Sequence, residues 1–307
     1  MKKAIIILIF YIINVIAAVG SGLTTSLALR FYPSAEASGM GNTFSSIGET
    51  AEVIYYNPSN LSNIERDKKQ FFINYATWIF DMYDASLVFA YPIADHTVGF
   101  AFRYFYIGEI TETIDPQQQE RKLLLYNLLS LISYSYKISN IKLAVNLKNL
   151  LQDYGRYKIS SIVFDIAGGM DVENFKIALN LSNLGGSLKI NNVDNPQPFL
   201  IKIGAGYKLN KIKLGLDLDI VEDNIKLHIG AEYKITKEMK IRFGYEQIDE
   251  FNFLKGISFG FGYEGKYEEI PTFKREIVPI VAIFNYSLTY LTEELGLSHR
   301  ISVGTKF

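Results

Sequence analysis

The chain has 307 residues, enough for one large domain or two smaller ones. Its 31 Lys and Arg residues balance 32 Asp and Glu residues, and the formal net charge of −1 gives no reason to expect a nucleic-acid partner. The absence of cysteine excludes disulfides, thiolate chemistry and a lipid-modified N-terminal cysteine.

The N-terminal region is typical of a signal peptide. Met1-Lys2-Lys3 is positively charged, and residues 4–19 are apolar except for Asn14. Small residues at Ala18-Val19-Gly20 favour cleavage after Gly20, so we predict a signal peptide over residues 1–20. The alternative is an uncleaved transmembrane anchor, for which the run is short, because a helical span needs about 20 apolar residues.

Residues 37–61 follow no regular period. Gly39 and Gly41 interrupt any helix or strand, because glycine readily takes φ > 0 and lets two backbones approach closely. Pro58 fixes its own φ and pushes Asn57 out of the α region, so this pair predicts a bend. A compact irregular segment before a long series of strands indicates a plug inside a hollow fold.

From Gln70 onward, apolar and polar residues alternate. In one clear case Leu214, Leu216 and Leu218 share a face, and Asp217 and Asp219 share the opposite face. A period of two is the signature of a β-strand, and the 21 Tyr and 21 Phe residues favour strands and membrane interfaces. We predict about fourteen strands, beginning near Gln70, Ala85, His96, Leu123, Ile141, Ser160, Phe175, Phe199, Lys211, Asn224, Met239, Gly256, Ile277 and Ser298. The leucine-rich stretch 123–131 could instead begin as a helix.

Alternation alone also fits a soluble β-sandwich. Two features favour a barrel in lipid: the polar face mixes charges with glycines, which suits a lumen, and short connections such as Ala94-Asp95 alternate with long ones such as 183–198. Glu222-Asp223 and 264–276 break this alternation.

We therefore predict an all-β, membrane-spanning, antiparallel up-and-down barrel. The barrel comprises residues 70–307, with an N-terminal hatch, residues 21–69, in its lumen and both chain ends on the side of the short turns. The apolar hatch residues need burial, and small lumen residues let the hatch approach the wall. These small residues are Gly99, Ala101, Gly204, Gly215, Gly230, Gly244 and Gly260.

Several short motifs occur in an order and spacing typical of a known family. They are Ala37-Ser38-Gly39-Met40-Gly41, Glu49-Thr50-Ala51-Glu52, Asn57-Pro58-Ser59-Asn60-Leu61, Asn183-Leu184-Gly185, Ala231-Glu232-Tyr233, and Gly296-Leu297-Ser298-His299-Arg300-Ile301-Ser302 with the terminal Phe307. On these residues the chain resembles the PorV/PorQ family, within the broader FadL-like outer-membrane transporters. Ser59 departs from the alanine usual after the proline.

The resemblance implies a barrel of about fourteen strands with a hatch in its lumen. It also implies insertion into the bacterial outer membrane by the barrel-assembly machinery, with Phe307 as the assembly signal. Function stays divided, because FadL-like proteins take up hydrophobic molecules whereas PorV-like proteins serve type IX secretion.

Two groups of residues are candidate sites. A hatch or gate site comprises Gly39, Met40, Gly41, Asn57 and Pro58, which could form a moving gate or only shape a static plug. A lumen-lining site comprises Lys213, Asp217, Asp219, His228, Glu232, Arg242 and Glu246. These charges could define a polar path for ligands, or pair across strands in a solvated lumen.

Catalysis has thin support in the sequence. The three histidines show no metal-ligand spacing, and Ser139-Asn140-Ile141-Lys142 fits a Ser-x-x-Lys pattern that is short enough to arise by chance. His228 and Ser258 could both face the lumen, two strands apart, as base and nucleophile. We expect no enzyme activity, no metal and no cofactor.

These features lead to an expected function and an alternative. We expect an outer-membrane transporter for hydrophobic small molecules resembling long-chain fatty acids, with passive passage gated by the hatch. The alternative is a barrel associated with type IX secretion that binds or shuttles secreted proteins. Expected partners are outer-membrane lipid, a fatty acid-like ligand, the barrel-assembly machinery and, in the alternative, secretion components. We expect a monomer that binds no nucleic acid.

Overall fold

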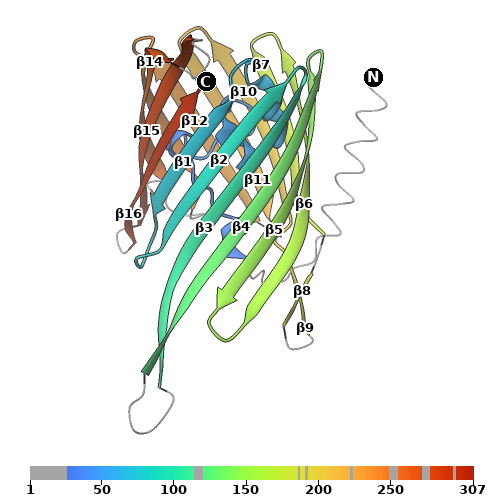
Figure 1. Cartoon of the computed structure of the whole chain (residues 1–307), viewed down its shortest axis with the longest axis vertical. Helices are drawn as coiled ribbons and strands as arrows, with labels where there is room; N and C mark the ends of the chain where they lie inside the picture. Colours follow the sequence, from blue (N-terminus) through green and yellow to red (C-terminus); the bar gives the residue numbers. More distant parts are fainter. Residues whose placement is uncertain are drawn as a thin grey trace.

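The computed structural model describes residues 26–113, 120–185, 187–190, 193–221, 224–248, 255–271, 277–292 and 295–307. Within these ranges, fourteen antiparallel strands close into a barrel, in the order β1-β16-β15-β14-β13-β12-β11-β10-β7-β6-β5-β4-β3-β2 (Figure 1). The predicted all-β barrel is therefore confirmed. The predicted signal peptide, residues 1–20, lies outside the described residues.

The barrel strands follow one another along the chain, apart from a separate two-stranded hairpin. They are β1 (Gln70–Thr77), β2 (Tyr83–Ile93), β3 (His96–Thr113), β4 (Glu120–Ile138), β5 (Ile141–Tyr154), β6 (Lys158–Val172), β7 (Phe175–Leu184), β10 (Leu200–Leu209), β11 (Ile212–Val221), β12 (Asn224–Lys234), β13 (Met239–Glu246), β14 (Ile257–Pro271), β15 (Ile277–Thr292) and β16 (Gly296–Lys306). The hairpin is β8 (Ser187–Ile190) with β9 (Val193–Pro196). Among the described residues, no helix is long and apolar enough to cross a bilayer.

Every predicted strand begins within three residues of an observed one. The suggestion that residues 123–131 begin as a helix is wrong, because they lie in β4, which pairs with β3 on one side and β5 on the other. Leucine has a good helix propensity, but backbone pairing on both sides overrides it. Leu129 and Leu131 are buried while Leu124 is exposed, as the strand period requires.

The two ends of the barrel differ. One end, the short-turn end, holds two-residue turns whose first residue has φ of 45–57° at Ala94, Ser139, Glu173 and Asn210. Such left-handed residues are typical of tight hairpins. The opposite, long-loop end is where β3 and β4 extend furthest, at the bottom of Figure 1.

The wall of the barrel begins and ends at the short-turn end, where the backbones of Lys69 and Phe307 exchange hydrogen bonds at 2.8 and 3.0 Å. Ser26, the first described residue, instead donates hydrogen bonds to Gln152 and Gln197 near the long-loop end. The predicted placement of both chain ends on the short-turn side therefore holds for the C-terminal end but not for the start of the described chain.

The long connection predicted at the short-turn end, residues 264–276, is wrong: β14 continues to Pro271 and pairs with β15, so the connection shortens to residues 272–276. Glu222-Asp223 lies outside the described residues.

The two faces of the wall are those that the alternation predicts. On β11, Leu214 and Leu216 are 47% and 42% exposed, whereas Asp217 is fully buried. Leu218 is half-buried on the outer face and Asp219 is buried on the inner one. An apolar exterior with polar side chains inside is typical of a membrane barrel.

The interior contains the chain that precedes β1. Residues 37–61, which we call the plug segment, run inside the ring of strands as the blue segment of Figure 1. The plug segment includes most of α2 (Ala35–Gly39), η2 (Ala51–Tyr55) and part of η3 (Pro58–Asn63), and η1 (Leu27–Leu29) precedes it. Its apolar side chains, among them Phe44, Ile54 and Tyr56, are at most 5% exposed. Full burial of such side chains contributes about 1.5–3 kcal/mol each.

Candidate functional site

The first half of the plug segment lies on a row of glycines. Gly206, Gly215, Gly230 and Gly244 face one another in register across β10, β11, β12 and β13, and we call them the glycine row. A Cβ atom on Gly244 would lie 1.9 Å from the backbone nitrogen of Gly41, so no side chain fits there. The plug backbone therefore touches the wall backbone directly.

The predicted small residues all meet the plug in this way or pack with it. A Cβ on Gly230 would lie 2.3 Å from the Met40 carbonyl oxygen, and one on Gly39 would lie 2.8 Å from the Cα atom of Gly260. Ala101 belongs to the apolar cluster that includes the plug. The corresponding close plug atoms at Gly99, Gly204 and Gly215 belong to Ile54, Ser45 and Thr43. The prediction that small lumen residues admit a plug is confirmed.

Two wall side chains hold the peptide groups of Gly41, whose φ of 64° favours glycine. The Gly41 N–H donates to the hydroxyl of Ser258 at 3.0 Å, and the Gly41 carbonyl accepts from Nδ1 of His228 at 2.9 Å. The suggested nucleophile–base pair of Ser258 and His228 is therefore wrong. Both side chains bind the plug instead.

Asp217 holds the next part of the plug. One oxygen of its carboxylate accepts the backbone N–H groups of Phe44 and Ser45, at 3.0 and 2.9 Å. The side chain is fully buried, so the expectation that the lumen charges are solvated is wrong for this residue. The plug replaces water as its hydrogen-bonding partner.

A chain of ion pairs continues toward the short-turn end. Glu49 of the plug pairs with Lys208 and Lys213, and Lys213 also lies 3.5 Å from Glu232. Although burial opposes ionisation of Glu49, Lys213 and Lys208 hold its pKa well below the usual range. Arg242 then joins Glu232 to a second plug carboxylate, Glu36, at 2.7 and 3.3 Å.

Glu36 lies close to another buried acid of the plug, Glu52. The hydroxyl of Thr50 is 3.2 Å from Glu36 and 3.5 Å from Glu52, and the Ser302 hydroxyl donates to Glu52 at 3.0 Å. Burial, and then the Glu36 charge, raise the pKa of Glu52 to about 7. Glu52 is therefore a plug residue whose charge changes near neutral pH.

The bend at Asn57-Pro58 is buried against the opposite wall. Asn57 caps η3 by accepting the Ser59 N–H at 3.0 Å, and Pro58 occupies the first turn, where its missing N–H costs nothing. The Asn57 amide also donates to the Gly168 carbonyl at 3.2 Å. The bend thus packs against β6.

Sequence reasoning missed the side chains that hold this second half. Asn146 donates to the Ile54 carbonyl at 3.0 Å, Asn180 to the Tyr56 carbonyl at 2.8 Å, and Lys142 to the Asn60 side chain at 2.8 Å. A signal was available, because each is a polar residue on the inward face of an alternating strand.

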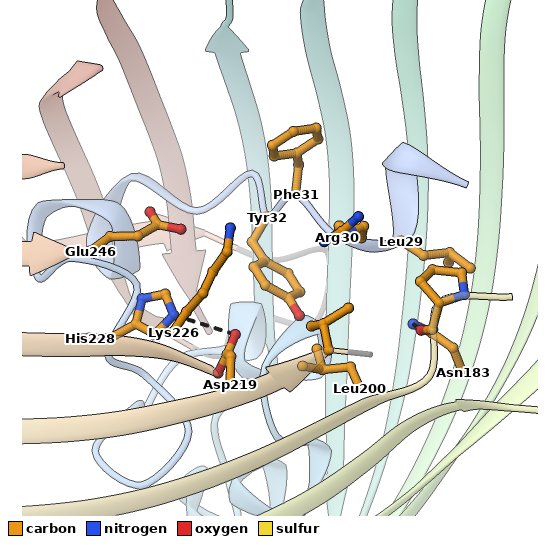
Figure 2. Close-up of a pocket in the computed structure, with 12 residues that line it drawn as sticks. Leu29, Arg30, Phe31, Tyr32, Asn183, Leu200, Asp219, Lys226, His228 and Glu246 are labelled. Atoms are coloured by element: carbon orange, nitrogen blue, oxygen red, sulfur yellow. Dashed lines mark hydrogen bonds and ion pairs between the residues drawn. The ribbon is translucent and has the colours of Figure 1, made fainter. Parts of the chain in front are cut away.

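A cavity of about 150 Å³ lies at the long-loop side of the plug (Figure 2). Its lining combines Leu29, Arg30, Phe31 and Tyr32 from the chain before the plug with Asn183, Pro198, Leu200, Asp219, Val221, Lys226, His228 and Glu246 from the barrel and its loops. Figure 2 shows the side chains of Tyr32 and Lys226 above the His228–Asp219 contact of 3.5 Å. The cavity is small, partly aromatic and charged along one side.

A second cavity, of about 210 Å³, lies at the short-turn side and includes Glu36, Glu49, Lys213 and Arg242 in its lining. The predicted lumen residues therefore separate into groups: Asp219, His228 and Glu246 line the first cavity, and Lys213 and Arg242 the second. Glu232 is fully enclosed beside Lys213, and Glu246 also accepts the Asn42 side-chain amide at 2.5 Å. The plug lies between the two cavities.

The sequence matches no protein-family model, and no curated protein is significantly similar to it. Solved structures are similar in fold. The toluene transporter TodX of Pseudomonas putida is 12% identical over 90% of this chain and 98% of its own, with a TM-score of 0.58. The toluene transporter TbuX of Ralstonia pickettii is 10% identical over 90% and 97%, with a TM-score of 0.55. A FadL homologue of Pseudomonas aeruginosa is 12% identical over 94% and 99%, also with 0.55. The chain therefore has a FadL-like barrel fold.

Proposed function

We propose that this protein is an outer-membrane transporter that lets hydrophobic small molecules pass when the plug segment moves. The fold is shared with proteins described as toluene transporters, and the exterior is apolar where a bilayer would contact it. The cavity beside Phe31 and Tyr32 offers aromatic and aliphatic surface to a small ligand. In this proposal the ligand enters from the long-loop side.

The observation that carries the proposal is how the plug is held. It occupies the interior between the two cavities, yet no disulfide cross-links it to the wall, since the chain has no cysteine. Its contacts are hydrogen bonds and ion pairs that each contribute only about 0.5–3 kcal/mol net. A segment held in this way can undock locally while the barrel stays closed. Gly39 and Gly41, with Met40 between them, are the proposed moving part, and Asn57 and Pro58 the pivot.

A disulfide between plug and wall tests the gate. The hydroxyls of Ser38 on the plug and Thr289 on β15 are 3.0 Å apart, so Ser38→Cys with Thr289→Cys places two sulfurs within reach of a bond. We expect the oxidised protein to lose uptake of oleate and toluene into proteoliposomes, and reduction to restore it. The barrel should remain folded in both states.

A matched control uses the same wall position. Thr289 faces Ser298 across β15 and β16, so Thr289→Cys with Ser298→Cys ties wall to wall and leaves the plug free. This variant should transport normally when oxidised. Undiminished uptake by the oxidised plug-to-wall variant would show that ligands pass without plug movement.

The alternative of a secretion-associated barrel in the manner of the PorV/PorQ family has one observation in its favour. β3 and β4 extend well past the rest of the rim at the long-loop end, as a surface that a protein could contact (Figure 1). Shortening this hairpin should then impair protein secretion and leave oleate uptake intact. The opposite result would favour the transporter.

A further inference from the structure

Arg300 differs from every other buried cation of the described chain. Seven Lys and Arg side chains are buried there, and six of them have a carboxylate within ion-pair distance. Arg300, on the inward face of β16, is 2% exposed and has none within the described residues. Its Nε and Nη1 atoms also have no hydrogen-bond acceptor. A buried guanidinium without an anion is costly, and arginine does not escape the cost by losing its proton.

The described surroundings of Arg300 supply more donors and no carboxylate within ion-pair distance. Its guanidinium lies 4.4 Å from the ring centroid of Trp78, a cation–π contact that leaves the N–H edges free. The Trp78 indole N–H is buried without a partner, and so is the hydroxyl of Ser287, which faces Arg300 across β15 and β16.

An aromatic path joins this cluster to the cavity of the proposed function. The Trp78 ring lies 4.8 Å from the ring of Phe31, which lines that cavity, and Phe31 lies 6.2 Å from Phe105. Phe31 is 36% exposed, so its ring is the one in this path that has room to change rotamer. The group thus offers aromatic faces beside unpaired donors.

We propose that Arg300, Trp78 and Ser287 form a subsite for the carboxylate of a small amphipathic ligand, whose apolar part packs along Phe31. The inference rests on the proposed function and narrows its substrate class from hydrophobic molecules in general to those with an anionic head. A carboxylate accepts several N–H and O–H groups at once, which matches the unpaired donors. A neutral hydrocarbon leaves them unpaired.

The test uses the single tryptophan of the chain, Trp78, as the reporter. The purified full-length protein in detergent is titrated with toluene and with its carboxylated analogue 4-methylbenzoate, at about pH 8, where the acid is ionised. Trp78 fluorescence follows binding, and calorimetry confirms the affinities. We expect 4-methylbenzoate to bind about tenfold or more tightly than toluene, because a hydrogen bond to a charged group contributes enough free energy to change the dissociation constant by that factor.

Three variants test whether the preference for 4-methylbenzoate over toluene depends on the subsite. Arg300→Gln should weaken 4-methylbenzoate binding about tenfold or more and leave toluene binding unchanged. Trp78→Phe, followed by calorimetry, keeps the aromatic face and should lose only part of the preference. Arg66→Gln is the charge-matched control: Arg66 is 67% exposed and pairs with Asp95 at the short-turn end, so both affinities should be retained.

Equal affinity of the wild-type protein for the two probes would overturn the proposal, whether or not the variants fold. So would an Arg300→Gln variant that keeps the preference, or equal quenching by chloride, which would show a site for inorganic anions only. Binding is measured here without transport, so failure of the plug-tethering experiment and failure of this subsite are separate results.

Discussion

The plug segment meets two walls that hold it by different physics. Toward β2–β6 it packs Val53, Ile54 and Leu61 into an apolar cluster with wall residues Val88, Ala101, Leu129, Leu131, Leu150 and Val163. Toward β10–β14 it presents backbone to Gly230 and Gly244 of the glycine row and to the side chains of Asp217, His228 and Ser258. Apolar side chains can change rotamer when a neighbour changes. Backbone atoms cannot, and on the glycine-lined wall they lie only 1.9–2.8 Å from where an added Cβ would be. The second wall should therefore be far less tolerant of change.

One readout serves all the comparisons. Ser46 is 1% exposed and its hydroxyl has no hydrogen-bond partner, so Ser46→Cys creates a buried thiol, the only one in the chain. Its labelling rate by a soluble thiol reagent measures how often the plug undocks, which gives the free energy of plug docking. Heat-modifiable electrophoretic mobility shows separately whether the barrel is folded.

The largest effect is expected from one methyl group on the glycine row. Gly244→Ala would place Cβ 1.9 Å from the Gly41 nitrogen and 2.2 Å from the Met40 carbonyl carbon, so the plug backbone must move away. Overpacking costs about 1–3 kcal/mol, and more where backbone is involved. We expect docking to weaken by about 3 kcal/mol or more, with faster labelling and a folded barrel.

Gly168→Ala is the control for this change. The atoms nearest to its virtual Cβ are 3.7 Å away, an ordinary contact distance. Its labelling rate should match the parent. Equally slow labelling of the Gly244→Ala protein would mean that the glycine row does not seat the plug.

The next effect depends on pH and involves Glu52. Its pKa is raised from 4.5 to about 7, so the docked plug binds a proton that the free segment does not. Docking should therefore weaken as pH rises from about 4.5 to about 7, and Glu52→Gln should remove this dependence. Groups facing Glu52 include Glu36, Ser302 and Arg242.

A second titration acts in the opposite direction at lower pH. Glu49 has a lowered pKa, so its ion pairs with Lys208 and Lys213 are lost as pH falls below 4.5. The labelling rate at each pH is divided by that of the unfolded protein at the same pH, because the thiolate fraction itself rises with pH. This ratio should be smallest near pH 4.5 in the parent protein. A flat profile of the ratio between 4.5 and 7 would contradict the role assigned to Glu52.

Asp217→Asn should have a moderate effect. The amide oxygen can still accept from Phe44 and Ser45, but the charge that strengthens these two hydrogen bonds is gone. We expect a loss of about 1–2 kcal/mol in docking. Asp95→Asn, at an exposed ion pair with Arg66, should change the free energy of docking by only about a few tenths of a kcal/mol. Equal labelling rates for Asp217→Asn and the parent protein would show that Asp217 behaves as a solvated lumen charge.

The barrel could be predicted from the sequence because its signal is local. Alternation along each strand, as in Leu214–Asp219, fixes both the strand and its two faces. Of the plug contacts, only the wall residues could be predicted, because glycines such as Gly244 occur among charged residues on the inward faces of the strands. The alternation on β5 and β7 places Asn146 and Asn180 on the inward face, but the plug has no period, so the plug carbonyls that they bind could not be predicted. Arg300 likewise resembles the paired cations in sequence, since pairing depends on residues far along the chain.

The smallest effect is expected from the same methyl addition on the apolar wall. Gly99→Ala would place Cβ 2.9 Å from Cδ1 of Ile54 and 3.1 Å from Cδ1 of Leu61. Both are ends of flexible side chains, which can turn at a cost of about 0.5–1.5 kcal/mol for an off-rotamer angle. We therefore expect Gly99→Ala to weaken docking by about 1 kcal/mol, well below Gly244→Ala, although both add one methyl.

Ile54→Val sharpens this last comparison, because it removes the Cδ1 atom that Gly99→Ala would meet. Alone it should cost about 0.5–1.5 kcal/mol, since it leaves a small gap in the cluster. In the double variant the new methyl fills that gap, so the two losses should partly cancel in a double-mutant cycle. No single side-chain truncation on the plug can relieve Gly244→Ala in this way, because the atoms it meets are backbone. Additive losses for the Gly99–Ile54 pair would show that the apolar wall is as rigid as the glycine row.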